Sequence, residues 1–263
     1  MGYNKFIRYG NIIETYTYGR DLQISREISR KHTRRAIRQG VDDGGKDTLS
    51  PAEFEGKRKD NAMRAQLAFR RLVLANLEGP ECSLLVTCTY RDNQTDIRVG
   101  YRDFGAFIQA LRYRFGPQFR YIAVPEFQKR GAVHFHALVW GLPGSIFDTE
   151  RDTRLLAGLW KQGFLYLKQT DGNERLSGYL AKYMAKSFID YRLMNQKAYV
   201  CSRNLKRPQI QGGISNFGMD ILLEEFGVTT PESDKSYDTH WLGKARHRIY
   251  KISTENPPKN LSS

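Results

Sequence analysis

The order of apolar and polar residues predicts helices and strands that alternate along most of the chain. Residues 52–77 carry apolar and basic side chains at helical spacing, with Leu67 and Leu74 among the apolar positions. Residues 82–90, CSLLVTCTY, are rich in β-forming residues and predict a buried strand. Further helices are expected at 20–38, 103–115, 150–161 and 174–188, and further strands at 119–128, 132–140 and 163–169.

Two of the expected strands are close neighbours in the chain. Residues 119–128 and 132–140 are separated by too few residues for a crossover, so they should form an antiparallel hairpin. The order strand, helix, strand, strand predicts an α+β fold in which helices pack against a central, mostly antiparallel sheet. By composition, we expect a basic helical N-terminal extension over 1–78, the main domain over 79–226 and a polar, loosely packed tail over 227–263.

The charge of the chain favours a phosphate-bearing partner. Lys and Arg number 42 and Asp and Glu 28, which gives a net charge of +14. A chain this basic is typical of proteins that bind nucleic acid and, less often, of proteins that bind anionic membranes. No apolar run approaches the roughly 20 residues of a membrane span, so no membrane partner is expected. The sequence also lacks a phosphate-binding GxxxxGK[ST] loop, which argues against an NTP-driven motor.

The cysteines and the first residues bear on where the protein acts. The chain has three cysteines, Cys82, Cys88 and Cys201, which form neither a CxxC pair nor a disulfide framework. That usage fits a reducing cytosol, and the N-terminus lacks the apolar core of a signal peptide. We therefore expect a cytoplasmic protein.

The strongest chemical signal is the stretch GAVHFHALVWG at 131–141, which holds two of the five histidines in the chain. Side chains alternate across a strand, so His134 and His136 point to one face, about 6.6 Å apart. A three-residue loop at 129–131, with glycine in the left-handed position, would pair Glu126 with His134. A two-residue loop would instead place Glu126 on the core face, so the register remains open at this point.

Two imidazoles and a carboxylate on one face can hold Mg²⁺, Mn²⁺, Zn²⁺ or Fe²⁺, and the residues do not choose among these ions. The alternative is two half-exposed histidines without a metal. A second candidate element is GYLAKYMAK at 178–186, where Tyr179 and Tyr183 are four residues apart, as are Lys182 and Lys186. On a helix each pair forms a short row, although the same spacing also suits tyrosines that pack in a core beside solvated lysines.

Taken together, these stretches resemble the HUH endonucleases, and in particular the rolling-circle replication initiators of small single-stranded DNA phages and plasmids. The three motifs of that family occur here in order, as LLVTCTY at 84–90, HFH at 134–136 and YLAKYMAK at 179–186. The resemblance covers roughly residues 80 to 190. It implies an RRM-like or ferredoxin-like core and makes Glu126 the acidic third ligand of the metal.

The resemblance also implies a reaction. Mg²⁺ or Mn²⁺ would act on the scissile phosphate of single-stranded origin DNA, and Tyr183, by preference over Tyr179, would attack the phosphorus. The products would be a 5′-phosphotyrosine link and a free 3′-OH for a host polymerase, with unwinding left to a host helicase. Lys182 and Lys186 would steady the phosphate or the phenolate. Salt-sensitive DNA affinity is expected from basic residues of the N-terminal part, which are otherwise a solvated face: Arg26, Arg30, Arg34, Arg35 and Arg38.

Other functions fit part of the pattern. A non-haem iron oxygenase would use the two histidines and the carboxylate but would leave the tyrosines and the charge unexplained. A non-catalytic single-strand DNA-binding protein would explain the charge and the aromatic residues but not the three ligands. A relaxase or transposase of the same superfamily is a nearer alternative, although relaxases carry three clustered histidines and only two lie together here. The sequence leaves the oligomeric state undetermined.

Overall fold

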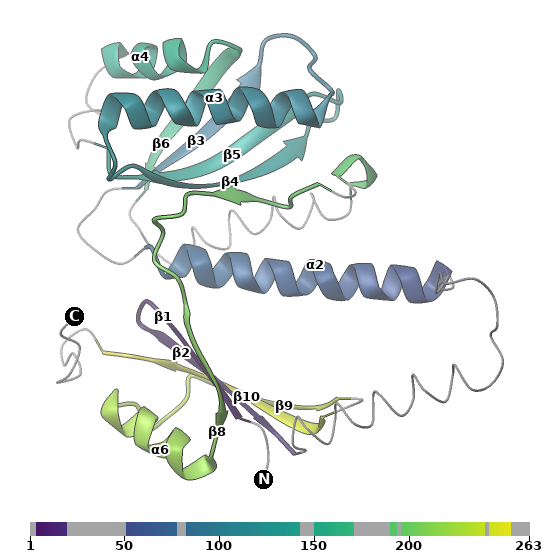
Figure 1. The fold of residues 1–263 in the computed structure, drawn as a ribbon, viewed down its shortest axis with the longest axis vertical. Coiled ribbons are helices and arrows are strands. Elements are labelled where there is room, and N and C mark those ends of the chain that lie inside the picture. The colour runs from purple at the N-terminus through teal and green to yellow at the C-terminus, as the bar shows by residue number, and fades with distance from the viewer. Residues whose placement is uncertain are drawn as a thin grey trace. The chain divides into compact units, whose positions relative to one another are not determined.

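The computed structural model of the protein describes residues 4–19, 51–77, 83–142, 150–170, 190–193, 196–239 and 242–253 (Figure 1). The chain forms two compact units. One contains residues 51–206, and the other combines residues 1–50 with 207–263. Each unit has its own five-stranded antiparallel sheet. The α+β class predicted from the sequence is therefore confirmed.

The unit of residues 51–206 is built on a β-α-β-β-α-β core. Its elements follow one another along the chain as β3 (Ser83–Tyr90), α3 (Ile97–Phe115), β4 (Arg120–Phe127), β5 (Val133–Trp140), α4 (Glu150–Trp160) and β6 (Gly163–Thr170). The strand order β6-β3-β5-β4 is that of the ferredoxin-like fold. The short strand β7 (Val200–Cys201) extends the sheet beyond β4, and α2 (Pro51–Leu74) precedes the core.

The two faces of this sheet are covered by different helices. Alternate residues of β5, Val133, Phe135 and Ala137, join residues of α3 and α4 in one buried cluster. The intervening residues Leu138 and Trp140 face the other way and belong to a second cluster with Phe69, Leu72 and Val73 of α2. Figure 1 shows α3 and α4 together on one face of the sheet and α2 beyond the other. The buried apolar area on both faces is the main force that holds the sheet between its helices.

Two local features fix the ends of the elements that bear on the site. The side chain of Asp96 accepts a hydrogen bond from the Arg98 backbone N–H and so caps the start of α3. Between β4 and β5, the Gln128 N–H donates to the Ala132 carbonyl at 2.9 Å, and Gly131 has φ of +91°. A glycine adopts that left-handed conformation without strain, and the three-residue loop expected at 129–131 is thereby confirmed.

The second unit is a separate antiparallel sheet with one helix. It contains β1 (Asn4–Tyr9), β2 (Ile12–Tyr18), β8 (Gln209–Ile214), α6 (Asn216–Glu225), β9 (Ser233–Thr239) and β10 (Gly243–Lys251). The strand order is β8-β1-β2-β10-β9, so the two ends of the sequence are paired in the same sheet. The buried cluster on one face combines residues of the sheet with residues of α6, among them Phe6, Ile13 and Leu223.

This unit divides the chain differently from the division expected by composition. Residues 4–18 form two strands, and the polar stretch after residue 227 contributes β9 and β10 to the same sheet. Composition does not reveal this arrangement, because the pairing joins residues more than two hundred positions apart. The expected helices at 20–38 and 174–188 lie outside the described residues. Within the described part of the chain, no helix is both long and apolar enough to cross a bilayer.

Candidate active site on the polar half of a sheet face

The candidate site lies on the sheet face that α2 covers, at the end nearer the β4–β5 loop. Apolar side chains of this face, such as Leu138 and Val124, pack under α2. Two residues further toward the loop the same face becomes polar, with His136 and His134 on β5 and Glu126 on β4. Strand alternation thus continues without interruption from a packed core into a polar cluster.

The register of the sheet brings the predicted residues together. Glu126 is paired with His134, as the three-residue loop requires, and Val124 is paired with His136. On the other side of β5, Thr89 is paired with His134 and Thr87 with His136. The alternative register, with Glu126 on the core face, is excluded. Directly paired residues share a face and lie about 5 Å apart, so one carboxylate and two imidazoles are neighbours.

His136 is held from both sides of its ring. Its Nε2 lies 2.7 Å from Oε2 of Glu126, and its Nδ1 lies 3.2 Å from Oγ1 of Thr87. The side chain of His136 is 7% exposed and that of Glu126 is 16% exposed. A neutral imidazole in this position donates from Nε2 to the carboxylate and accepts at Nδ1 from the threonine hydroxyl. The two contacts fix the orientation of the ring.

His134 differs from its neighbour, because its Nε2 is buried and meets no hydrogen-bond partner in the described part of the protein. Its ring centroid lies 6.4 Å from that of His136. Burial, reinforced by the neighbouring His136, lowers the pKa of His134 to about 4. The ring is therefore neutral at pH 7 and carries a lone pair on one nitrogen, as a metal ligand must.

The three side chains do not surround a common point. Within the described ranges, no three His, Cys, Asp or Glu side chains are placed as ligands of one ion. The His136–Glu126 contact instead joins two of the candidates directly. The donor set nevertheless suits a divalent cation, and a buried imidazole nitrogen without a partner is costly unless something binds it. On that observation the residues fit a metal.

The other predicted site residues lie outside the described parts of the chain. This holds for Tyr179, Lys182, Tyr183 and Lys186, and for the five arginines Arg26, Arg30, Arg34, Arg35 and Arg38. The chain on either side of the tyrosine stretch is described, however. Thr170 at the end of β6 is paired with Ser83, at the end of the sheet away from the β4–β5 loop.

The chain is described again from Asp190, near the β4–β5 loop. The guanidinium of Arg192 stacks over the ring of Phe127 at 4.0 Å and donates from Nε to Asp190 at 2.8 Å. Phe127 directly follows Glu126 in β4. Arg192 could not be singled out from the sequence, because its contact with Phe127 joins distant segments of the chain.

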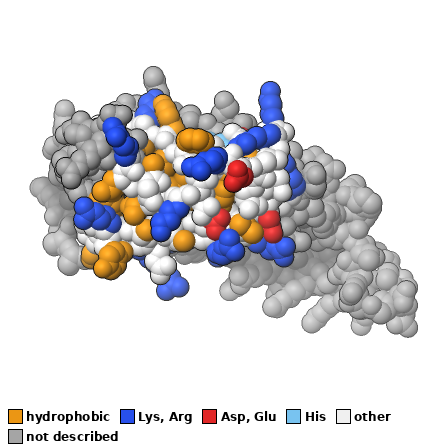
Figure 2. All heavy atoms as spheres, turned by 90° about the horizontal axis from the view of Figure 1, so that it is seen from above, with side chains coloured by type: hydrophobic (Ala, Val, Ile, Leu, Met, Phe, Trp, Pro, Cys, Tyr) orange, Lys and Arg blue, Asp and Glu red, His pale blue; other side chains and the backbone are white. Residues whose placement is uncertain are grey.

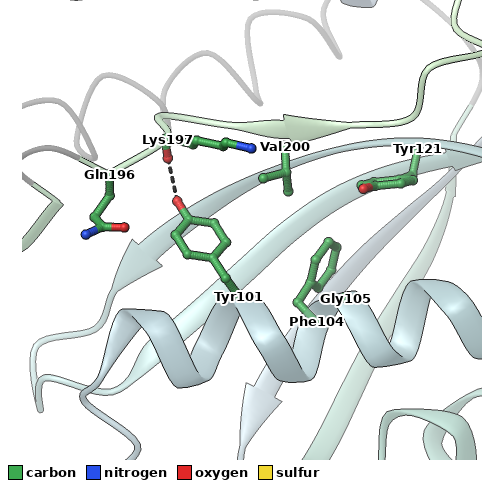
Figure 3. A pocket seen from close by; sticks show the side chains of 7 residues that line it. All are labelled: Tyr101, Phe104, Gly105, Tyr121, Gln196, Lys197 and Val200. Atoms are coloured by element: carbon green, nitrogen blue, oxygen red, sulfur yellow. Dashed lines mark hydrogen bonds between the residues drawn. The ribbon is translucent and has the colours of Figure 1, made fainter.

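A cavity of about 290 Å³ lies on the opposite side of the sheet (Figure 3). It is lined by Tyr101, Phe104 and Gly105 of α3, by Tyr121 of β4 and by Gln196, Lys197 and Val200 near β7. The Tyr101 hydroxyl donates to the Lys197 carbonyl, and burial raises the pKa of Tyr101 to about 12. The lining includes three aromatic side chains and holds no pair of acid and base, so this cavity does not compete with the histidine face as a reaction site.

His247 occupies neither region. The sequence alone could not place this residue, and it lies on β10 in the other unit, stacked on Tyr16 with ring centroids 4.3 Å apart. Among the described histidines, only His134 and His136 belong to the unit of residues 51–206.

Comparison with known proteins gives one family. Residues 83–188 match the model of the family described as Replication-associated protein ORF2/G2P. No curated protein and no solved structure matches the chain. The matched stretch begins with β3, includes the histidine hairpin and extends past the two tyrosines. The similarity supports a role in DNA replication, as the sequence motifs indicated.

Proposed function

We propose that this protein initiates rolling-circle replication by nicking single-stranded origin DNA, as an HUH endonuclease does. One observation carries the proposal. Within the stretch that is similar to replication-associated proteins, the sheet places Glu126, His134 and His136 side by side, with a buried His134 nitrogen that meets no partner among the described residues. A purely structural pair of histidines gives no reason for that nitrogen to be buried without a partner.

Glu126, His134 and His136 would hold the divalent cation, Mg²⁺ or Mn²⁺. Such an ion, when bound, withdraws negative charge from a non-bridging oxygen of the scissile phosphate. Thr87 supports this use of His136, because a hydroxyl both donates and accepts. When Nε2 of His136 gives up its proton to act as a ligand, Nδ1 carries the proton and donates it to the Thr87 oxygen, which lies 3.2 Å away.

Tyr183 is the proposed nucleophile, with Tyr179 as the second tyrosine. The phenol oxygen forms a bond to phosphorus as the bond from phosphorus to the 3′ oxygen breaks, and the phenol proton passes to the departing 3′ oxygen. The new phosphotyrosine bond keeps the energy for a later rejoining, so no nucleotide triphosphate is consumed. Lys182 and Lys186 would steady the phosphate, or the negative charge that develops on the phenol oxygen as its proton leaves.

The covalent chain allows Tyr183 to reach the site. Asp190 accepts a hydrogen bond from Arg192, whose guanidinium stacks over Phe127. Phe127 directly follows Glu126 in the sequence. Asp190 follows Tyr183 by seven positions, which limits the distance between their Cα atoms to at most about 25 Å, or about 10 Å if the stretch is helical. The tether therefore permits Tyr183 to reach the histidine face.

The test is the formation of a covalent protein–DNA adduct. The protein is incubated with Mn²⁺ and single-stranded oligonucleotides tiled over the DNA that carries its gene, and the products are separated on a denaturing gel. We expect an adduct that excess chelator abolishes, with the DNA linked to the peptide that contains Tyr179 and Tyr183. Tyr183→Phe should lose most nicking, whereas Tyr179→Phe should still nick but fail to release closed circles.

The tyrosine variants separate the possible outcomes. Adduct formation in chelator, or full nicking by the double Tyr179→Phe, Tyr183→Phe variant, would overturn the proposed chemistry. Normal circle release by Tyr179→Phe would assign that residue to packing and leave a single-tyrosine enzyme. Stoichiometric binding of the oligonucleotides without any adduct would identify a non-catalytic DNA-binding protein instead.

A further inference from the structure

Two large aromatic side chains stand exposed on the edge of the histidine face. Phe164 and Tyr166 of β6 are each 62% exposed, while Leu165 and Leu167 between and after them pack against the core on the α3 side. Alternation therefore places Phe164 and Tyr166 on the same face as the two histidines. Large aromatic rings gain free energy when they are buried, so the fold itself does not require these two rings to be exposed.

The register aligns each exposed ring with one histidine. Phe164 is paired with Thr89, which is paired in turn with His134. In the next row Tyr166 is paired with Thr87, and Thr87 with His136. Each ring thus lies two strands from its histidine, about 10 Å away across the sheet. The face presents two parallel rows that run from an aromatic ring, past a threonine, to an imidazole.

The start of strand β6, which carries these rings, is fixed against β3. The Arg91 N–H donates to the Gln162 carbonyl at 3.0 Å, and the indole N–H of Trp160 donates to the Thr89 carbonyl at 3.1 Å. Gly163 fits because an added Cβ would lie 2.4 Å from the Thr89 carbonyl oxygen, so β6 approaches β3 very closely there. Phe164, the next residue, is held at a defined position beside Thr89.

The surroundings of the rings are basic. Lys168 continues the exposed row of β6, and Lys161 and Arg91 are exposed near the start of the strand. The eight residues of β6 include no acidic side chain, although Asp92 follows Arg91. Figure 2 shows the molecule from the side of α3 and α4 rather than from the histidine face, and there too Lys and Arg side chains are spread among hydrophobic ones while acidic side chains are few. Exposed aromatic rings among basic residues are typical of surfaces that bind single-stranded nucleic acid.

We propose that Phe164 and Tyr166 stack two consecutive bases of the single-stranded DNA and guide the strand across the sheet toward His134 and His136. This inference rests on the proposed function, since it names residues that position the substrate of that site. The rings are about 6.6 Å apart along β6, which leaves room for each to take a separate base. Stacking does not depend on base identity, so these residues supply affinity and position rather than sequence readout.

The experiment measures the affinity of the full-length protein for a short mixed-sequence oligonucleotide at several salt concentrations, without metal. Phe164→Ala and Tyr166→Ala should each weaken binding about five-fold or more, and Tyr166→Phe should bind as the wild type does. The slope of affinity against salt should stay unchanged in both alanine variants, because no phosphate contact is lost. Lys168→Ala should flatten that slope by about one unit.

Tyr113→Ala is the matched control. Tyr113 is 96% exposed on α3, on the opposite side of the sheet, so its removal should leave DNA affinity unchanged. Equal melting temperatures of all variants would show that the fold is intact. A 2-aminopurine base in the oligonucleotide should be quenched by the wild type and less quenched by Phe164→Ala.

The outcomes are distinct from those of the adduct test. Unchanged affinity and quenching in Phe164→Ala and Tyr166→Ala would overturn the stacking proposal, even if the wild type forms its covalent adduct normally. If these variants lose affinity and the wild type never forms an adduct, the stacking surface is supported and the nuclease is rejected. A shift from dimer to monomer without loss of DNA affinity would show that β6 pairs with a second copy instead, and would also overturn the proposal.

Discussion

Each unit of this protein places a glutamate beside a histidine on a sheet face, and the two pairs are built differently. In the unit with both chain ends, Glu14 accepts hydrogen bonds from the hydroxyls of Tyr9 and Tyr16, and the latter is 2.9 Å long. His247 lies with Nε2 3.4 Å from Glu14 and stacks on Tyr16. This His247 nitrogen makes no well-aligned hydrogen bond, but a carboxylate faces it.

The pair of Glu126 and His136 has a second histidine, His134, beside it. Glu126 lies 2.7 Å from His136, and His134 is next to both, with a buried Nε2 that meets no partner in the described structure. Glu14 is 4% exposed, whereas the Glu126 side chain is 16% exposed. A His–Glu pair on a sheet face therefore does not by itself mark a reaction site. The distinguishing signs are a second imidazole with an unused nitrogen and an accessible carboxylate.

The largest expected difference is in cleavage. His136→Ala should slow nicking by about a thousand-fold, since loss of a metal ligand removes several kcal/mol of transition-state stabilisation, at about 1.4 kcal/mol per ten-fold. DNA binding should persist, because affinity comes mainly from phosphate contacts. His247→Ala should leave the nicking rate within about two-fold. Single-turnover assays measure the nicking rates of both variants. Equal rates for His136→Ala and His247→Ala would contradict the proposed difference between the two pairs.

The loss of stability, in contrast, should be larger for the pair that contains Glu14 than for the pair that contains Glu126. Glu14→Ala leaves two tyrosine hydroxyls without their acceptor in a buried site and removes the carboxylate that faces His247, and should lower the free energy of unfolding by about 3 kcal/mol. Glu126→Ala should lower it by less than about 1 kcal/mol, because water can reach the partly exposed position. Urea titrations followed by circular dichroism compare the variants. A larger loss in Glu126→Ala would make the second pair the structural one.

A smaller effect is expected from the residue behind His136. Thr87→Val keeps the shape of the side chain but removes the hydroxyl that lies 3.2 Å from Nδ1 of His136. Loss of such an outer contact costs about ten-fold or more in activity or metal affinity. The Thr87→Ser variant keeps the hydroxyl and should restore most of the rate, which a packing role for Thr87 would not predict.

The fold and site could be predicted from sequence where the information is local. The alternation around His134 and His136 predicted the hairpin, and the glycine at 131 favoured a three-residue loop, but the register stayed open until the structure paired Glu126 with His134. The β-α-β-β-α-β order also follows from local patterns. The motif resemblance pointed to Glu126 before its register was known.

Other features depend on contacts that the sequence does not display. The pairing of β1 and β2 with β8 and β10 joins opposite ends of the chain, and polar strands such as β9 resemble loops by composition. The burial of His134 results from packing rather than from its neighbours in sequence. The two rings of β6 share a row with the histidines only through the intervening strand β3.

The central claim is that His134, His136 and Glu126 form one divalent cation site, and Mn²⁺ binding tests it most directly. Electron paramagnetic resonance can count bound Mn²⁺ in the wild type, His134→Ala and His247→Ala, each with a single-stranded oligonucleotide present. We expect one bound Mn²⁺ per chain in the wild type and in His247→Ala, and weak or no binding in His134→Ala. Wild-type binding that survives in His134→Ala, or no binding in the wild type, would contradict the account.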